Sequence, residues 1–257
     1  MYARNVIVVD EHDELLRNPA LVESAREGLR HGDCYILKNA VSREYCDQMR
    51  AYMTQIGRNS LPNYHPIAEG CPNFHRMNRW DERAYVKGCF HQFSFFPWNE
   101  DVLNLFERTK NVYRVKNLLT GVPQDKFLGK KPDEGCTARL AFQFYPKAIG
   151  GLNKHEDPVD YHQVSATIMT LSVKGHDFFE GGSYVEKEGG EPVMLDDITE
   201  PGDIIHTNAQ VNHGVMTIDP HLSEDWLSFE GRWMLLFAIN QVAGNTAIRE
   251  AKDLGGK

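Results

Sequence analysis

Residues 201–219 read PGDIIHTNAQVNHGVMTID, and this stretch contains two short strands with a turn before each. The turn residues Pro-Gly-Asp at 201–203 precede the apolar run IIHT, and His213 with Gly214 opens a second β-rich run. The stretch therefore predicts two consecutive strands, with a histidine at the start of the second.

The same pattern extends over the second half of the chain. From about residue 137, short runs rich in β-branched and aromatic residues alternate with Gly, Pro, Asp or Asn. Several strands at this spacing predict an all-β sandwich or barrel. The expected strands are TARLAFQFYP (137–146), VSATIMTLSV (164–173), GGSYVEKEG (181–189), EPVMLDDI (191–198), DIIHTNAQVN (203–212), GVMTID (214–219) and RWMLLFAINQ (232–241).

The first half of the chain carries helical signals. One helix is expected in PALVESAREGLRHGD (19–33), followed by a short strand in CYILKN (34–39). A second helix is expected after Ser42 as N-cap, and a third from Asn99 to Gly121. The expected buried residues of these two helices are Tyr45, Cys46, Met49, Met53 and Ile56, and Val102, Leu105, Phe106, Val112 and Leu119.

The length of 257 residues fits a single domain. We expect a helical part at about 1–136, a β core at about 137–245 and a C-terminal tail at 246–257. No run of eighteen apolar residues occurs, and the N-terminus becomes acidic too early for a signal peptide, so a cytoplasmic protein without a membrane span is expected.

Charge and cysteine content exclude several classes of partner and site. The net charge is −8 and no long basic stripe is present, so nucleic acid is not an expected partner. The five cysteines are widely spaced and form no CxxC motif, which predicts neither a disulfide framework nor a cysteine zinc site.

Three histidines are followed two residues later by an acid, at 12–14, 31–33 and 155–157. The first pair lies in the acidic N-terminal segment and the second at a helix end, where such residues are common without a ligand. His155 and Asp157 instead lie between expected strands. On an extended segment, residues i and i+2 point the same way, so both side chains can converge on one ion.

His213 is the expected third ligand of this ion. It lies at a strand end, where the mouth of a barrel would be, whereas the rival His206 lies within a strand. Two histidines and one carboxylate leave coordination positions open, as a non-haem Fe(II) centre that activates oxygen requires.

An ordered set of segments then resembles the Fe(II)/2-oxoglutarate-dependent oxygenases of the double-stranded β-helix fold. The resemblance covers most of the chain and is strongest from 142 to 240. Its segments are QFYPKAIGGLNKHED (143–157), FEGGSYVE (179–186), EPGDIIHTNAQVNHGV (200–215) and GRWMLLFAIN (231–240), with EGLRHGDCYILKNAVSREYCDQM (27–49) similar to the entry of small-molecule hydroxylases.

The resemblance implies a mainly β fold: a double-stranded β-helix core supported by N-terminal helices. It also implies that His155, Asp157 and His213 form the catalytic metal site for Fe(II), and that Arg232 binds the distal carboxylate of the cosubstrate 2-oxoglutarate. With O2, the implied reaction hydroxylates a C–H bond of a small polar metabolite and releases succinate and CO2.

The sequence departs from the family pattern near Arg232. The segment PHLSEDWLSFEG (220–231) resembles an insertion, and no serine follows Arg232 at the position where some relatives use one to hold the cosubstrate. Tyr145, with Thr170 as the next choice, is the expected second partner of that carboxylate.

The substrate site is the least defined. The candidates Arg76, Arg79, His91 and Arg139, with Trp80 and Trp98, would suit a carboxylate or phosphate group. The same residues could equally pair with surface acids or pack between helices and sheet. Two other functions stay open: a cupin-type metal oxygenase that needs no keto acid, and a non-catalytic β-sandwich binding module.

Overall fold

The second half of the chain folds into strands at the expected places. The computed structural model describes residues 1–159, 162–242 and 252–255. The strands from residue 136 onward are β5 (Cys136–Pro146), β6 (Gly151–Glu156), β7 (Ser165–Thr170), β8 (Gly182–Glu186), β9 (Pro192–Met194), β10 (Ile204–Asn208), β11 (His213–Met216), β12 (Gly231–Gln241) and β13 (Lys252–Asp253), with a 3-10 turn, η1, at Leu195–Asp197.

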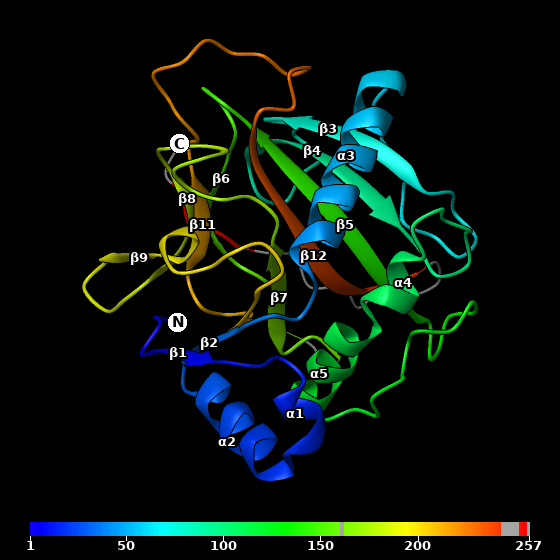
Figure 1. Cartoon of the computed structure of the whole chain (residues 1–257), viewed down its shortest axis with the longest axis vertical. Helices are drawn as coiled ribbons and strands as arrows, with labels where there is room; N and C mark the ends of the chain where they lie inside the picture. The colour runs from blue at the N-terminus through cyan, green and yellow to red at the C-terminus, as the bar shows by residue number, and fades with distance from the viewer. Residues whose placement is uncertain (160–161, 243–251, 256–257) are drawn as a thin grey trace.

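These strands form one sheet that curls until its two ends face each other (Figure 1). One part has the strand order β10-β7-β12-β5 and the other has the order β6-β11-β8-β9. The connecting strand β4 (Gly88–Phe95) pairs with both β5 and β6. This arrangement confirms the expected double-stranded β-helix.

Strand β12 shows how the two faces of the sheet differ. Met234 and Leu236 point into a cavity between the facing parts of the sheet. Trp233, Leu235 and Phe237 alternate with them and join the main hydrophobic core. Both faces of β12 are therefore covered, which explains its nearly continuous apolar sequence.

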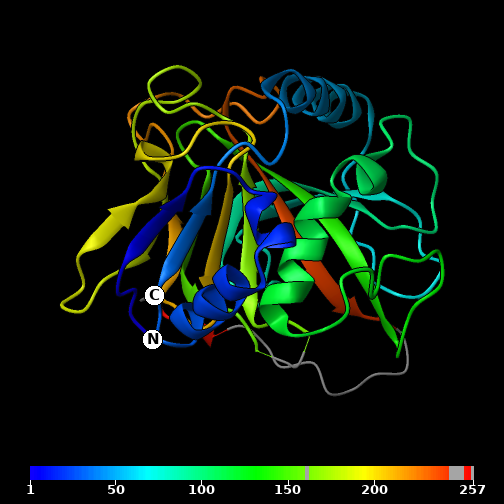
Figure 2. The same cartoon turned by 60° about the horizontal axis from the view of Figure 1, so that its bottom comes forward.

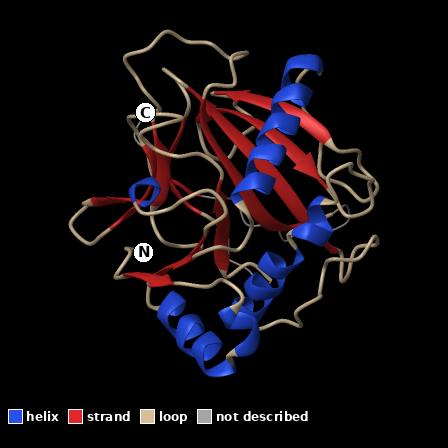
Figure 3. Ribbon diagram, in the orientation of Figure 1, coloured by secondary structure: helices blue, strands red, loops and turns tan. Residues whose placement is uncertain are grey.

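Helices cover the outer face of the β10-β7-β12-β5 part, whereas loops border much of the other part (Figure 3). Helix α2 (Pro19–Arg30) packs beside α5 (Lys110–Thr120), as Figure 2 shows. Helix α3 (Arg43–Asn59) contributes Met49 and Met53 to the same core as Trp233. The expected N-cap is present, because the Ser42 hydroxyl accepts from the Tyr45 N–H. Among the described residues, no helix is both long and apolar enough for a membrane span.

The first 136 residues hold more than helices. They contribute β1 (Val6–Val9), β2 (Cys34–Leu37), β3 (Phe74–Arg79) and β4 to the sheet, and a short helix α1 (Glu14–Arg17). Of these strands, only β2 was expected from the sequence. Strands β1 and β3 each pair with one neighbour and are partly exposed, whereas β4 is buried almost throughout, so none of the three shows a regular alternation of buried and solvated residues.

The prediction of a helix from Asn99 to Gly121 was wrong for residues 99–104, which are not helical. The structure has α4 (Leu105–Arg108) and then α5, and Val102 is exposed. The Asp101 carboxylate accepts from the backbone N–H groups of Leu103 and Leu105, which holds a turn in place of a helix. Asn104 then adopts a left-handed conformation (φ 51°), so the helix begins only after it.

Gly202 ties the turn before β10 to the loop before α3. Its φ is +96°, and a side chain there would overlap the carbonyl oxygen of Val41. Gly189 has nearly the same φ, +94°, with nothing near its Cβ position. We expect Gly189→Ala to lower the free energy of unfolding by about 1 kcal/mol, and Gly202→Ala by roughly 2–4 kcal/mol. Guanidinium denaturation checks both; equal losses would contradict the close approach.

Candidate metal centre

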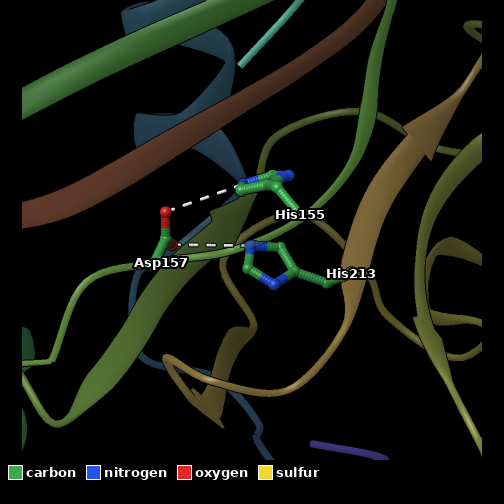
Figure 4. Close-up of side chains that lie close together, drawn as sticks. All are labelled: His155, Asp157 and His213. Carbon is green, nitrogen blue, oxygen red and sulfur yellow. Dashed lines mark ion pairs between the residues drawn. The ribbon is translucent and has the colours of Figure 1, made fainter. Parts of the chain in front are cut away.

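Strands β6 and β11 bring the two histidines together. His155 is the fifth residue of β6 and His213 is the first of β11, and the two are direct partners in the antiparallel register. Asp157 follows β6 immediately. Its carboxylate lies 3.6 Å from Nε2 of His155 and 3.4 Å from Nε2 of His213 (Figure 4).

Backbone carbonyls orient both imidazoles. His155 Nδ1 donates to the Asn153 carbonyl at 2.8 Å, and His213 Nδ1 donates to the Val211 carbonyl at 2.7 Å. A nitrogen that donates to a carbonyl carries the proton, so in the neutral ring the lone pair is on Nε2. Both rings are thereby oriented with Nε2 away from the carbonyls, an arrangement common among histidines that bind metals.

The electrostatics of the site fit a bound cation. Burial would raise the pKa of Asp157, but the hydrogen bond and charge of His213, then His155 and Lys116, lower it to about 2. Burial would lower the pKa of His213, and Asp157 raises it instead. The carboxylate is therefore ionised at neutral pH and draws positive charge toward both rings.

The donor atoms of His155, Asp157 and His213 all lie within 4.8 Å of one another. Among the residues described, this is the one such group of three histidine, cysteine or acid side chains. Two imidazoles and one carboxylate on adjoining strand ends are a donor set suited to a non-haem Fe(II) ion.

The rival histidines lie elsewhere. His206 is buried with its Nδ1 beside the hydroxyls of Ser165 and Thr167. His12 is buried against Asp13, and His31 is an exposed residue at the end of α2.

Arg232 is fully buried at the start of β12. Its Nε donates to Asp196 at 2.7 Å, and the Asp196 carboxylate also accepts from the backbone N–H and hydroxyl of Ser183. Nη1 and Nη2 have no hydrogen-bond partner in the part of the chain that the structure describes. A buried guanidinium with two unused donors on one edge fits an additional carboxylate.

The two expected helpers of Arg232 differ in position. The Tyr145 ring lies 5.7 Å from the guanidinium carbon of Arg232, and its hydroxyl donates to Gln143 at 2.6 Å. The Thr170 hydroxyl donates to Thr199 at 3.1 Å. Tyr145 lines the cavity that holds the metal triad, and Thr170 does not.

That cavity has a volume of about 470 Å³ and lies between the two facing parts of the sheet. The metal triad is in its wall. The irregular segment before and after β3 also contributes, through residues 64–67 and 83–86. The cavity is large enough for a small molecule beside the metal.

The four candidate substrate residues separate into two pairs. Arg76 and Arg139 line the cavity. Arg79 is half exposed on the other face of β3 and pairs with Glu224 at 2.9 Å. His91 is buried behind the cavity wall between His75 and the carbonyl of Trp226.

Two residues near the site were missed in the sequence. Asp196, in η1, carried no local signal. Lys116 is buried on α5 and donates to the Ser165 carbonyl and the Thr167 hydroxyl, and its charge helps to lower the pKa of Asp157. Its signal was available: Lys116 is four residues after Val112, on the face expected to be buried.

Comparisons with known proteins support the fold. No protein-family model and no curated protein sequence matches the chain. Solved structures do match, at low sequence identity.

A full-length Neurospora crassa protein in complex with alpha-KG and thymine has 11% identity and a TM-score of 0.53, covering 91% of this chain and 84% of its own. A Pseudomonas putida prolyl-4-hydroxylase has 10% identity and a TM-score of 0.50, covering 87% and 100%. SnoN, an alpha-ketoglutarate-dependent epimerase from nogalamycin biosynthesis, has 12% identity and a TM-score of 0.50, covering 93% and 97%. The chain therefore has the fold of iron- and 2-oxoglutarate-dependent oxygenases.

Metal binding tests the triad. We expect wild-type protein to bind one Fe(II) or Mn(II), and His213→Ala to lose stoichiometric binding, because two remaining ligands hold such ions weakly. His31→Ala is the control, since it removes an exposed histidine from a rival pair. Elemental analysis after desalting measures the bound metal; full retention in His213→Ala would exclude this site.

The histidine pair behind the cavity gives a pH prediction. His75 Nε2 lies 2.8 Å from His91 Nδ1, and burial lowers the pKa of each to about 4. Unfolded histidines take up protons near pH 6.5, so native stability falls as pH drops from 6.5 toward 4.

We expect His75→Gln/His91→Gln to reduce that pH-dependent loss by about 1–2 kcal/mol, allowing for solvent screening. Urea denaturation at pH 7 and pH 4.5 measures it. Identical losses in both proteins would show that the pair is not the cause.

Proposed function

We infer that the chain is an Fe(II)/2-oxoglutarate-dependent oxygenase that hydroxylates an unactivated C–H bond of a small polar metabolite. The observation that carries this proposal is the combination of two features inside one barrel. His155, Asp157 and His213 converge on one point, and Nη1 and Nη2 of Arg232 are buried donors without a partner among the described residues. The first suits the iron and the second suits the cosubstrate.

The three metal ligands would hold Fe(II) from one side and leave its other positions for cosubstrate and oxygen. When bound, iron with 2-oxoglutarate supplies the oxidant that removes the substrate hydrogen. Asp157 supplies the negative charge, and the hydrogen bond and charge of His213, then the charges of His155 and Lys116, lower its pKa and keep that carboxylate ionised. Backbone carbonyls keep both rings in the ligand orientation.

Arg232 would bind the distal carboxylate of 2-oxoglutarate through Nη1 and Nη2. Asp196 holds the guanidinium by Nε, and the backbone and hydroxyl of Ser183 hold Asp196. This fixes the arginine before the cosubstrate arrives, so little side-chain entropy is lost on binding.

The cavity would hold the substrate beside the metal. Its walls include Phe90, Leu152, Met234 and Leu236, which exclude water from the reaction. Proteins with this fold include a hydroxylase and an epimerase. We propose hydroxylation as the outcome. The cytoplasmic location expected from the sequence stays a prediction.

One observation favours a second function. Asp196 already neutralises Arg232, and such a pair can be purely structural. In that case the chain would be a metal oxygenase of cupin type that uses no keto acid. Coupling of succinate release to substrate oxidation separates the two functions.

Anaerobic titration tests the proposal. Fe(II)-loaded protein should develop a weak visible charge-transfer band on addition of 2-oxoglutarate. Arg232→Lys keeps a positive charge beside Asp196 but loses the forked donor pair, so it should weaken 2-oxoglutarate binding roughly tenfold with metal binding retained. Arg79→Gln, outside the cavity, is the control.

If folded, iron-loaded protein shows no such band, 2-oxoglutarate is not its cosubstrate. A protein that binds neither iron nor manganese would instead support a non-catalytic binding module.

A further inference from the structure

The cavity is positively charged, although the chain as a whole has a net charge of −8. Three arginines line it: Arg76, Arg83 and Arg139. Among the described lining residues the one carboxylate is Asp157, which belongs to the metal centre. Neighbouring guanidinium groups repel one another, and a bound anion would relieve this repulsion.

Arg139 is the clearest case. Its Nε is buried, and no described residue accepts a hydrogen bond from it or pairs with its guanidinium. Burial, opposed by Tyr113 and reinforced by the charge of Arg76, lowers its pKa to about 10, so it stays charged at neutral pH. A buried charge without a partner is costly, and a ligand anion would offset that cost.

Arg76 is nearly as free. Its Nη2 lies 3.5 Å from the Asp81 carboxylate and its guanidinium carbon lies 5.4 Å from the centre of the Tyr64 ring, but its buried Nε and Nη2 atoms make no hydrogen bond to any described residue. Asp81 is already engaged by Arg83, through Nε at 2.9 Å and Nη2 at 2.8 Å. Asp81 therefore pairs with two arginines here, and no described acid pairs with Arg139.

Arg139 lies far from Arg232, the proposed cosubstrate anchor. Arg232 is paired in register with Tyr145 on β5, and Arg139 is six residues from Tyr145 on the same strand. At about 3.4 Å per residue, the two strand positions are about 20 Å apart. One molecule of 2-oxoglutarate bound at Arg232 is too short to reach Arg139 as well, so an anion at Arg139 would be a different group.

We propose that Arg76 and Arg139 form the anion-binding subsite for the substrate, and that the substrate is a small molecule with an apolar body and a carboxylate or phosphate group. This assignment rests on the proposed oxygenase function. The anionic group is held at the arginines, and the apolar body lies along Phe74, Phe90 and Leu236 toward the metal.

Matched probes test this subsite on Mn(II)-loaded protein with saturating 2-oxoglutarate. 3-Phenylpropionate and phenyl phosphate should bind and raise the unfolding temperature, whereas 3-phenylpropionamide, the neutral analogue of the first, should not. Whichever of 3-phenylpropionate and phenyl phosphate binds more tightly shows whether the subsite prefers a carboxylate or a phosphate group.

The variants Arg139→Gln and Arg76→Gln should each weaken binding of the acids roughly 10- to 100-fold, because each removes a charge-assisted hydrogen bond. Both should keep the Fe(II)/2-oxoglutarate band. Arg79→Gln, on the same strand as Arg76 but paired with Glu224 outside the cavity, should bind the acids like wild type.

Equal binding of acid and amide, or unchanged acid binding in both cavity variants, would overturn the subsite while the band still supports the oxygenase. Acid binding lost equally in Arg79→Gln would also overturn it, because that result indicates general surface charge. Absence of the band itself would instead refute the proposed function on which the subsite rests.

Discussion

The antiparallel pairing of β6 with β11 is the constraint on which the site depends. It places His155 opposite His213 and leaves Asp157 just beyond the paired region. Strand β4 pairs with both β5 and β6, and in this way connects the part of the curled sheet that contains β6 and β11 to the other part. Chain segments distant in sequence thus bring the three candidate ligands to one point, and backbone hydrogen bonds of the strands hold them there.

Buried charge is handled differently at the two ends of the barrel. Near the metal, each charge has a protein partner: Arg232 has Asp196, and Asp157 has two imidazoles with Lys116 behind them. At the far end, Arg139 has no partner among the described residues. Since an unpaired buried charge is expensive, this contrast supports a ligand anion at Arg139, in addition to the cosubstrate carboxylate proposed for Nη1 and Nη2 of Arg232.

Much of this arrangement could be predicted from sequence. Strand alternation and turn residues indicated the β core, and the position of His213 at a strand start separated it from His206. The pairing partners of Arg232 and Arg79 could not be predicted, because Asp196 and Glu224 meet them only through tertiary folding. The helix expected from Asn99 failed for a local reason, since the Asp101 side chain competes with helical hydrogen bonding.

A crystal structure of the protein with Mn(II) and 2-oxoglutarate, grown anaerobically, would show directly where the metal and the cosubstrate bind. We expect one metal ion bound by His155, Asp157 and His213, with the distal carboxylate of 2-oxoglutarate on Nη1 and Nη2 of Arg232. A metal bound elsewhere, or 2-oxoglutarate bound at Arg139 with Arg232 paired to Asp196 alone, would contradict it.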